Sequence, residues 1–294
     1  MPIMSWLCLP RMTVEIRHLR AFLTIAEEGH LTRAAERLHL SQPALSRTLA
    51  QLEAQLGVQL VDRSTHHLAL TDDGKRFERA ARRAVRAVDD AIASATATSS
   101  PLRIGQSWAV SAHLSPIVRA WTAAHPERPL HVAREEDRSA GLLTGRVDVA
   151  ITRGPLTDPG LRSIVLDEEP RVAVLPADHR LAARRTLRLR DLAGETLVTQ
   201  SRAGTTTLEL WTADRRPATV VDVGSMDDWL VAIASDAGVG VSVASTAALH
   251  PHPDLRFVPL SDAAAVPLLL AWPARGAHPA TKEFVRIARS VTAN

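Results

Sequence analysis

The sequence is poor in cysteine, in lysine and in long apolar runs. Among its 294 residues Cys8 is the single cysteine, which excludes a disulfide framework within one chain and most thiolate metal sites. Lys75 and Lys282 are its only lysines, so a cationic surface would consist of arginine, whose forked donors suit phosphates and carboxylates. No uninterrupted apolar run reaches about 18 residues, and a membrane partner is therefore not expected.

The start of the chain does not resemble an export signal. The opening MPIMSWLCLPRM contains two prolines and a short apolar run, and it lacks a basic first region. We therefore expect a cytoplasmic protein, whose translation starts at either Met1 or Met12. The formal net charge is only +3, and the length suits two or three domains.

Residues 16–57 have the pattern of three consecutive helices. Apolar residues recur at helical spacing over 16–28, and Gly29 is suited to end that helix. Thr32 is placed to cap a second helix and Ser41 to cap a third, which Gly57 ends. The third helix has one stripe to bury, formed by Leu45, Leu49, Leu52 and Leu56.

The other face of the third helix is polar. Gln42, Ser46 and Arg47 can bond base edges or phosphates in a major groove, and the small Ala50 allows close approach. Pro43 is tolerated in the first turn of a helix. Two short helices joined by a three-residue turn match a helix-turn-helix. A three-helix bundle that binds protein fits the same periodicity.

Two strand-like segments, VQLVDR and HHLALT, follow and predict a wing. A long helix then runs from Thr71 to about Thr98, and its apolar stripe consists of Phe77, Ala81, Ala84, Val88 and Ile92. We expect this stripe to lack a partner in its own chain and to pair with a second copy. The segment TATSSP, which ends at Pro101, is the expected linker.

From Leu102 onward, strand-like segments alternate with helical ones, a period that predicts parallel α/β sheets. LRIG, LHVAR and VDVAIT form a first set of strands, and RVAVLP, ETLVTQ, ATVVDVG and GVSVA form a second. We therefore expect two subdomains, with helices over 114–124, 227–237 and 281–291. PLLLAWP and the last helix should return to complete the first subdomain.

The run LRAFLTIAEEGHLTRAAERLHLSQPALSRTLAQLEAQLGVQLVDR resembles the N-terminal domain of LysR-type transcriptional regulators. The family elements AAxxLxxSQPAxS, LExxLGxxL and LTxxG are present at 34–46, 52–60 and 70–74, and GRVDVAI and LPADHRLA are also similar to the family. The resemblance covers the whole chain. It implies a mostly α winged helix-turn-helix, a long linker helix and an α/β effector-binding module. That module has two Rossmann-like subdomains, similar to type 2 periplasmic binding proteins.

The resemblance also implies partners and a DNA-contacting surface. The partners are double-stranded promoter DNA, a small-molecule effector and further copies in a homodimer or homotetramer, with RNA polymerase as an additional candidate and no cofactor. Val61 stands where the family usually has phenylalanine, and His30 replaces a common serine. His66 and His67 occupy a wing that is often basic, which leaves Arg63 as its main contact. The residues expected at DNA are Thr32, Ser41, Gln42, Pro43, Ser46, Arg47 and Arg63.

We expect three regions. A winged helix-turn-helix domain should occupy residues 12–71, a linker and dimerisation helix 72–100, and an effector-binding domain 101–294. Within the last, subdomain I should comprise about 101–171 and 271–294, and subdomain II about 172–270.

Ligands in open α/β sheets bind beyond the carboxyl ends of strands. The residues found there, which match the stretches lining the effector cleft in the resembled family, are Gln106, Ser107, Trp108, Thr152, Arg153, Gln200, Ser201, Ser225 and Met226. Each alone fits turn or cap chemistry equally well. Arg153 and Arg202 would bring two guanidinium groups to a small organic acid, with Trp108 and Met226 against its body. The open alternative is a neutral ligand with both arginines pointing outward.

We expect neither a catalytic nor a metal site. His250 and His252 alternate in HPHPD, but two prolines and the lack of further clustered ligands favour a surface loop. The glycines of DAGVGVSV lie between a helix and a strand, the wrong order for a dinucleotide loop. No nucleophile elbow is present. The hypothesis is an effector-responsive DNA-binding regulator rather than an enzyme, and the alternative is a solute-binding protein without DNA function.

Overall fold

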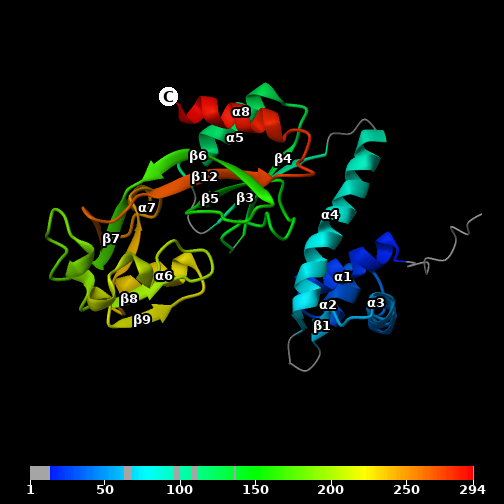
Figure 1. Cartoon of the computed structure of the whole chain (residues 1–294), viewed down its shortest axis with the longest axis horizontal. Helices are drawn as coiled ribbons and strands as arrows, with labels where there is room; N and C mark the ends of the chain where they lie inside the picture. Colours follow the sequence, from blue (N-terminus) through cyan, green and yellow to red (C-terminus); the bar gives the residue numbers. More distant parts are fainter. Residues whose placement is uncertain (1–13, 63–67, 96–99, 108–110, 136, 294) are drawn as a thin grey trace, which may run out of the picture. The chain divides into compact units, whose positions relative to one another are not determined.

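The computed structural model describes residues 14–62, 68–95, 100–107, 111–135 and 137–293. The chain divides into two compact units, residues 1–98 and 99–294 (Figure 1). Among the expected site residues, Arg63 and Trp108 lie outside the described residues, as do His66 and His67 of the wing. Within the described parts, no helix is long and apolar enough to cross a membrane.

The N-terminal unit consists of three helices, a two-stranded wing and a long fourth helix. Its elements are α1 (Ile16–Glu28), α2 (Leu31–Arg37), α3 (Gln42–Leu56), β1 (Val61–Asp62), β2 (Ala69–Leu70) and α4 (Asp72–Ala95). The two wing strands pair antiparallel. Gly29 and Gly57 end α1 and α3 in the left-handed conformation, which confirms both expected stops.

The leucine stripe of α3 forms the centre of this unit. Leu45, Leu49 and Leu52 are almost fully buried, whereas Leu56 is only half-buried. Ala34 and Ala35 of α2 and Phe22 of α1 belong to the same cluster. The two small alanines let α2 and α3 approach closely, as a helix-turn-helix requires.

The cap of α2 differs from the expectation. The Nδ1 atom of His30 accepts a hydrogen bond from the backbone N–H of Thr32 at 3.2 Å, so His30 is the N-cap and Thr32 lies inside the first turn. His30 thereby does what the serine common in the family would do, because both offer an acceptor to an unpaired helix N–H.

Two residues of the sequence motifs hold the wing against the helices. The Oε1 atom of Glu53 accepts hydrogen bonds from the backbone N–H groups of Leu60 and Val61 at 2.8 and 3.2 Å. Gly74 in the first turn of α4 has no room for a side chain, since a Cβ there would lie 2.0 Å from the Leu60 carbonyl oxygen. The motif glycine is therefore required by close backbone approach.

The expectation that the stripe of α4 has no partner in its own chain is wrong for its first half. Phe77 packs edge-on against Phe22 of α1 with ring centroids 5.2 Å apart, and Ala81 is buried in the same cluster. Ion pairs from Arg20 to Asp89 and from Arg82 to Glu27 join α1 and α4 as well. The exposed remainder of the stripe consists of Ala84, Val88 and Ile92.

The first subdomain of the C-terminal unit contains a five-stranded mixed sheet. Its elements are β3 (Leu102–Gln106), α5 (Leu114–Ala124), β4 (Leu130–Arg134), β5 (Val149–Arg153), β6 (Leu161–Glu169), β12 (Val266–Pro273) and α8 (Thr281–Thr292). The strand order is β4-β3-β5-β12-β6. β3 runs parallel to β4 and β5, but β12 is antiparallel to β5 and β6, so the expected purely parallel sheet is wrong. The helices α5 and α8 pack on one face through Trp121 and Phe284 (Figure 1).

The second subdomain repeats this arrangement. Its elements are β7 (Arg171–Pro176), β8 (Thr196–Thr199), β9 (Thr219–Asp222), α6 (Met226–Ala234), β10 (Gly240–Val243), α7 (Ser245–Leu249) and β11 (Leu255–Pro259), with short 3₁₀ turns at Leu189–Leu192, Leu208–Leu210 and Ala213–Arg215. β10, β7 and β11 form an antiparallel sheet, and β8 pairs parallel with β9. A parallel bridge from Leu197 to Val239 connects the two groups.

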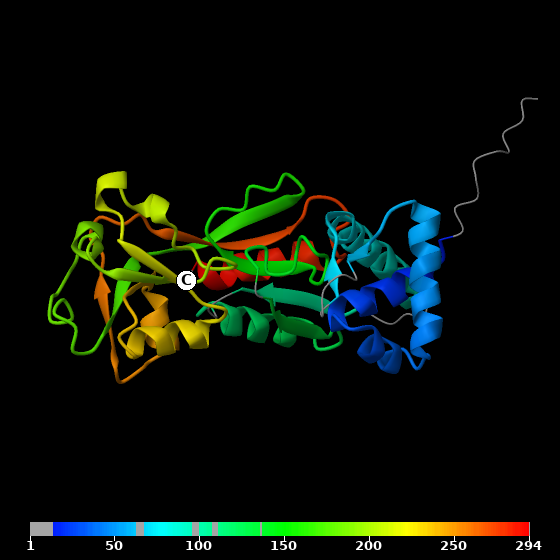
Figure 2. The ribbon, with the colours of Figure 1, turned by 90° about the horizontal axis from the view of Figure 1, so that it is seen from below.

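Two chain crossings join the subdomains (Figure 2). The first passes from β6 to β7 through Pro170, and the second occupies residues 260–265 between β11 and β12. Because β12 begins at Val266, the chain returns to the first sheet before residue 271, the expected boundary. Helix α7 and the strands β6 and β11 were not among the expected elements.

Candidate functional site

The outward face of α3 carries the residues expected to contact DNA. Gln42, Pro43 and Arg47 are exposed and Ser46 is half-buried. The Ser41 hydroxyl accepts a hydrogen bond from the Ala44 N–H at 3.4 Å, which makes it the N-cap, as expected. Thr32 is exposed in the first turn of α2. The leucine stripe is thus turned inward, and the polar residues are free to meet a groove.

The expected residues of the first subdomain lie at the carboxyl ends of β3 and β5. Gln106 is half-buried, while Ser107 and Thr152 are 5% and 1% exposed. Among the described residues, neither Gln106 Oε1 nor Thr152 Oγ1 has a hydrogen-bond partner. Buried polar atoms without partners are uncommon and call for an explanation such as a bound molecule. The register places Ser107 and Thr152 on one face of the sheet and Gln106 on the other, so they do not form one cluster.

Arg153 is not available as a free guanidinium, contrary to the expectation. Its Nε donates to Glu169 Oε2 at 2.5 Å and its Nη2 to Glu169 Oε1 at 3.3 Å. The Arg153 Nη2 also reaches Ser245 Oγ at 3.4 Å, and that hydroxyl donates to Glu169. Both charged side chains are at least nine-tenths buried. This cluster connects the ends of β5 and β6 to α7, and therefore the first subdomain to the second.

The expected residues of the second subdomain are largely engaged in local structure. The side-chain oxygen of Gln200 accepts from the N–H groups of Ala203 and Gly204, and its nitrogen donates to the Gly224 carbonyl. The Ser201 hydroxyl donates to Asp222, whose pKa this hydrogen bond lowers. Turn chemistry therefore explains both residues.

The two residues at the start of α6, which were expected to line a ligand site, also have local structural roles. Ser225 is the N-cap of α6 and accepts from the Asp228 N–H at 3.1 Å. Met226 is fully buried among apolar residues of the second subdomain, so it cannot supply apolar contact to a ligand. Arg202 is exposed.

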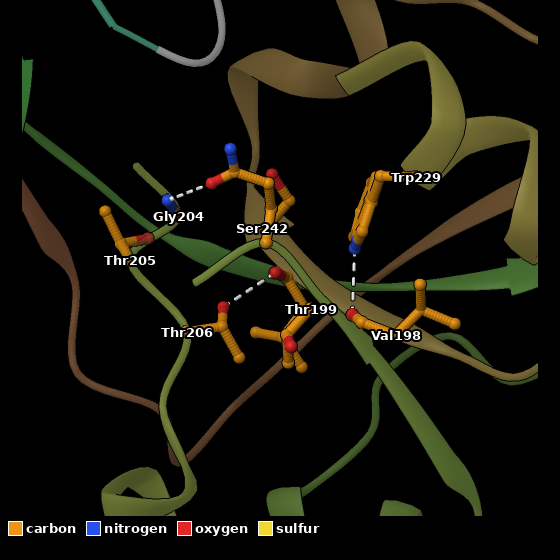
Figure 3. Close-up of a pocket in the computed structure, with 9 residues that line it drawn as sticks. Val198, Thr199, Gly204, Thr205, Thr206, Trp229 and Ser242 are labelled. Carbon is orange, nitrogen blue, oxygen red and sulfur yellow. Dashed lines mark hydrogen bonds between the residues drawn. The ribbon is translucent and has the colours of Figure 1, made fainter. Parts of the chain in front are cut away.

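A small pocket opens at the carboxyl end of β8 (Figure 3). It is lined by Val198, Thr199, Gln200, Gly204, Thr205, Thr206, Trp229, Val241 and Ser242. Trp229 Nε1 donates to the Val198 carbonyl and Thr206 Oγ1 to that of Val241, both at 2.8 Å (Figure 3). The walls are rich in hydroxyl groups, and the space holds about one water molecule.

His250, which the sequence pattern assigned to a surface loop, lies close to both subdomains. His250 follows α7 and is only half-buried overall, but its Nε2 is buried without a partner among the described residues. Burial lowers the pKa of His250 from its usual 6.5; Asp227 opposes this shift, and Arg134 and Arg153 add to it. These three charges lie on α6, β4 and β5, so His250 is close to charged residues of both subdomains. The sequence did contain a signal for His250, the alternating histidines of HPHPD, but the pattern favoured a surface loop.

We predict that the C-terminal unit loses stability as the pH falls below about 6.5. The folded state resists protonation of His250, whereas the unfolded chain takes up the proton at the ordinary pKa, so acid favours unfolding. His250→Asn should therefore show a shallower decline of the urea midpoint between about pH 7.5 and pH 5.5, followed by tryptophan fluorescence. His131→Asn, on an exposed residue of β4, is the control. Identical declines in all three proteins would contradict the prediction.

Comparisons with known proteins match both units. The family model described as the LysR substrate binding domain matches residues 95–293. The model of bacterial regulatory helix-turn-helix proteins of the lysR family matches residues 16–75. Together they account for both units that the structure describes.

Single relatives and solved structures agree with the models. The uncharacterized HTH-type transcriptional regulator YnfL of Escherichia coli (strain K12) is 32% identical over 93% of this chain and 97% of its own. A probable hydrogen peroxide-inducible genes activator of Mycobacterium leprae (strain TN) is 35% identical over 58% of this chain and 57% of its own. The structure of full-length CbnR complexed with its target DNA is 26% identical, with a TM-score of 0.64, and the match covers 95% of this chain and 100% of CbnR.

Proposed function

Because this chain belongs to the LysR family of bacterial helix-turn-helix transcriptional regulators, we propose that it binds promoter DNA and changes transcription when its C-terminal unit binds a small molecule. The family resemblance in the sequence, and the winged helix-turn-helix and α/β effector module expected from it, are confirmed. The proposed partners are double-stranded promoter DNA and RNA polymerase, and the proposed compartment is the cytoplasm.

One observation carries the DNA-binding half of the proposal. α3 buries three leucines almost completely and leaves Gln42, Pro43 and Arg47 exposed beyond a capped N-terminus. A helix of this kind, preceded by a short helix and a tight turn, places its first residues at base edges in a major groove. We assign Gln42, Ser46 and Arg47 to base or phosphate contacts, with Thr32 and Ser41 nearest to phosphates.

A gel-shift titration of the full chain tests this half. The duplexes are the DNA upstream of the chain's own gene, that upstream of the neighbouring gene, and a shuffled sequence of equal composition. A specific regulator should bind one upstream duplex about 10³-fold or more tightly than the shuffled one. Equal binding to all three would contradict the proposal.

We propose that two copies pair through α4. Ala84 and Val88 are exposed apolar residues of its stripe and do not belong to the cluster that packs against α1. A pair of copies would present two recognition helices to half-sites about 34–36 Å apart, or a multiple of that spacing. The operator would then be an imperfect palindrome.

We propose that the effector binds between the subdomains, at the carboxyl ends of the first-sheet strands. Ser107 and Thr152 share one face of the first sheet, and Arg153, directly after Thr152, reaches Ser245 of α7. His250 lies near charged residues of both subdomains. Among the described residues, Oγ1 of Thr152 and Nε2 of His250 have no hydrogen-bond partner, and these are the atoms whose hydrogen bonds a ligand would complete. Gln200 and Ser201, at the end of β8, remain proposed parts of the wall, whereas Gln106 lies on the other face of the sheet and Met226 is buried in the core.

For the effector itself we propose a small organic acid. Glu169 neutralises Arg153, so the cation proposed here is Arg134, which lies at the exposed end of β4 and lowers the pKa of His250. Asp227 acts on His250 in the opposite sense and more strongly, so the preference for a carboxylate rests on direct contact with the guanidinium.

The prediction is that carboxylic acids bind and their amides do not. In calorimetric titrations of the full chain with a panel of matched acids and amides, Arg134→Ala should weaken binding of the acid about tenfold or more, the loss of one charge-assisted contact. Arg162→Ala, on an exposed residue of β6, should leave it unchanged. Binding of amides alone, or equal binding to Arg134→Ala, would remove the acidic effector and leave the DNA-binding proposal intact.

A thiol switch within one chain does not suit this sequence. The M. leprae relative is described as a probable hydrogen peroxide-inducible genes activator, but closing a disulfide within one chain takes two cysteines and this sequence has only Cys8. Reversible binding of a small molecule is therefore the proposed signal.

A further inference from the structure

Arg171 is a buried arginine at the point where the chain first enters the second subdomain. It opens β7, directly after the crossing from β6, and it is 7% exposed. Its backbone carbonyl accepts from the N–H of Leu260, at the start of the second crossing. Arg171 therefore lies where the two crossings run side by side, which is where a hinge between subdomains has to bend.

The guanidinium of Arg171 is held entirely by neutral oxygens among the described residues. Its Nε donates to the Ala264 carbonyl at 3.1 Å, its Nη2 to the Thr205 carbonyl at 3.1 Å and its Nη1 to Thr205 Oγ1 at 3.4 Å. The part of the chain that the structure describes offers it no carboxylate within ion-pair distance. Burial alone lowers its pKa, without a compensating acid. A buried cation of this kind is costly, and an apolar residue would fill the space at lower cost.

The geometry of these bonds suggests why an arginine is there. Ala264 belongs to the second crossing, and Thr205 belongs to the loop after β8 that lines the pocket. A Cβ built on Gly154, at the end of β5, would lie 3.6 Å from the Thr205 methyl group, so this loop also meets the first subdomain. Only a planar fork with several donors can hold the loop and the crossing at once.

We propose that Arg171 is a hinge clamp, a positioning residue that fixes the loop 200–206 to both crossings so that the loop and the hinge move together. A ligand that displaces the loop would then change the angle between the subdomains, because the guanidinium transmits the movement. Only the response to a ligand rests on the proposed function, because the clamp itself needs neither ligand nor DNA.

Hydrogen exchange of the ligand-free full chain, read by mass spectrometry, tests the clamp. The reporter amides are Ala203 and Gly204, which Gln200 protects, and Ser261 in the second crossing, which donates to the Leu187 carbonyl. In Arg171→Gln and Arg171→Lys, peptides covering 201–206 and 260–265 should exchange at least tenfold faster than in the wild type. Arg256→Gln is the matched control, because the exposed Arg256 donates to backbone carbonyls as well, those of Pro253 and Leu255.

Three results would overturn the clamp. Unchanged exchange in both segments would show that other contacts hold them. Wild-type exchange in Arg171→Lys would show that charge suffices without the fork. A uniform increase that includes β10 would show a general loss of stability rather than a local coupling. The same variants are assayed for operator binding, which the clamp should leave intact, so failure of DNA binding by the wild type would contradict the proposed function and leave the clamp standing.

Discussion

Glu169→Ala should destabilise the C-terminal unit by about 3–5 kcal/mol, because it removes the carboxylate from a buried ion pair. The Arg153 and Glu169 side chains are only 5% and 9% exposed, and Arg153 lies too deep to regain water without opening the junction. The loss also breaks the bond from Ser245 to Glu169, which ties α7 to the first subdomain. We therefore expect the subdomain junction to open first.

Urea unfolding followed by tryptophan fluorescence measures this loss in the intact chain. Trp6 lies outside the described residues and all other tryptophans follow residue 98, so this signal reports mainly the C-terminal unit. Glu168→Ala, on the exposed neighbouring residue, should change the free energy of unfolding by less than about 0.5 kcal/mol. The double variant Arg153→Met with Glu169→Ala should recover most of the stability, because it removes both charges. A single-variant loss equal to that of Glu168→Ala would contradict the account.

Val88→Glu should convert the protein to monomers and weaken operator binding by about 10²-fold or more, since each half-site would then be bound without the second. The substitution places a carboxylate in the exposed part of the α4 stripe, where pairing would bury it without a partner. Val88 is exposed and does not belong to the cluster that packs against α1, so the fold of the N-terminal unit should survive.

The matched control is Ala87→Glu, which adds the same charge about 100° round the helix. It should remain dimeric in sedimentation velocity experiments at micromolar concentration and should retain operator affinity. If Val88→Glu sediments and binds like Ala87→Glu, then α4 is not the pairing surface.

The buried face of each element could be predicted from the sequence, but the element that packs against that face could not. Apolar runs located β3, β4, β5, β7 and β12, and the stripe of α3 predicted its inner face, because periodicity reports which side of an element is covered. It does not report what covers it. Phe77 was therefore assigned to a second copy although α1 packs against it, and the direction of β12 was missed because antiparallel and parallel buried strands look alike.

The candidate ligand site shows the same limit. The rule that ligands bind beyond strand ends led to Ser107 and Thr152, which are buried at the carboxyl ends of β3 and β5 and share one face of the sheet. It also led to Arg153 as a free cation, but Glu169 lies 16 residues later, and only the pairing of β5 and β6 with β12 brings the two together. β6 was missed because its exposed edge carries polar residues, which weaken the strand pattern.

Quantitative footprinting of the wild type and Arg47→Ala on the upstream DNA tests the central claim most directly. The account predicts two protected segments centred about 10–10.5 base pairs apart, or a multiple of this, on the wild-type complex. Arg47→Ala should weaken this specific complex by about 1–3 kcal/mol if the guanidinium bonds a base, and binding to shuffled DNA should be unchanged. Arg17→Ala, on an exposed residue of α1 outside the recognition helix, should footprint like the wild type. A single protected segment, or a footprint in which folded Arg47→Ala equals the wild type, would contradict the assignment of α3 as the recognition helix of a paired regulator.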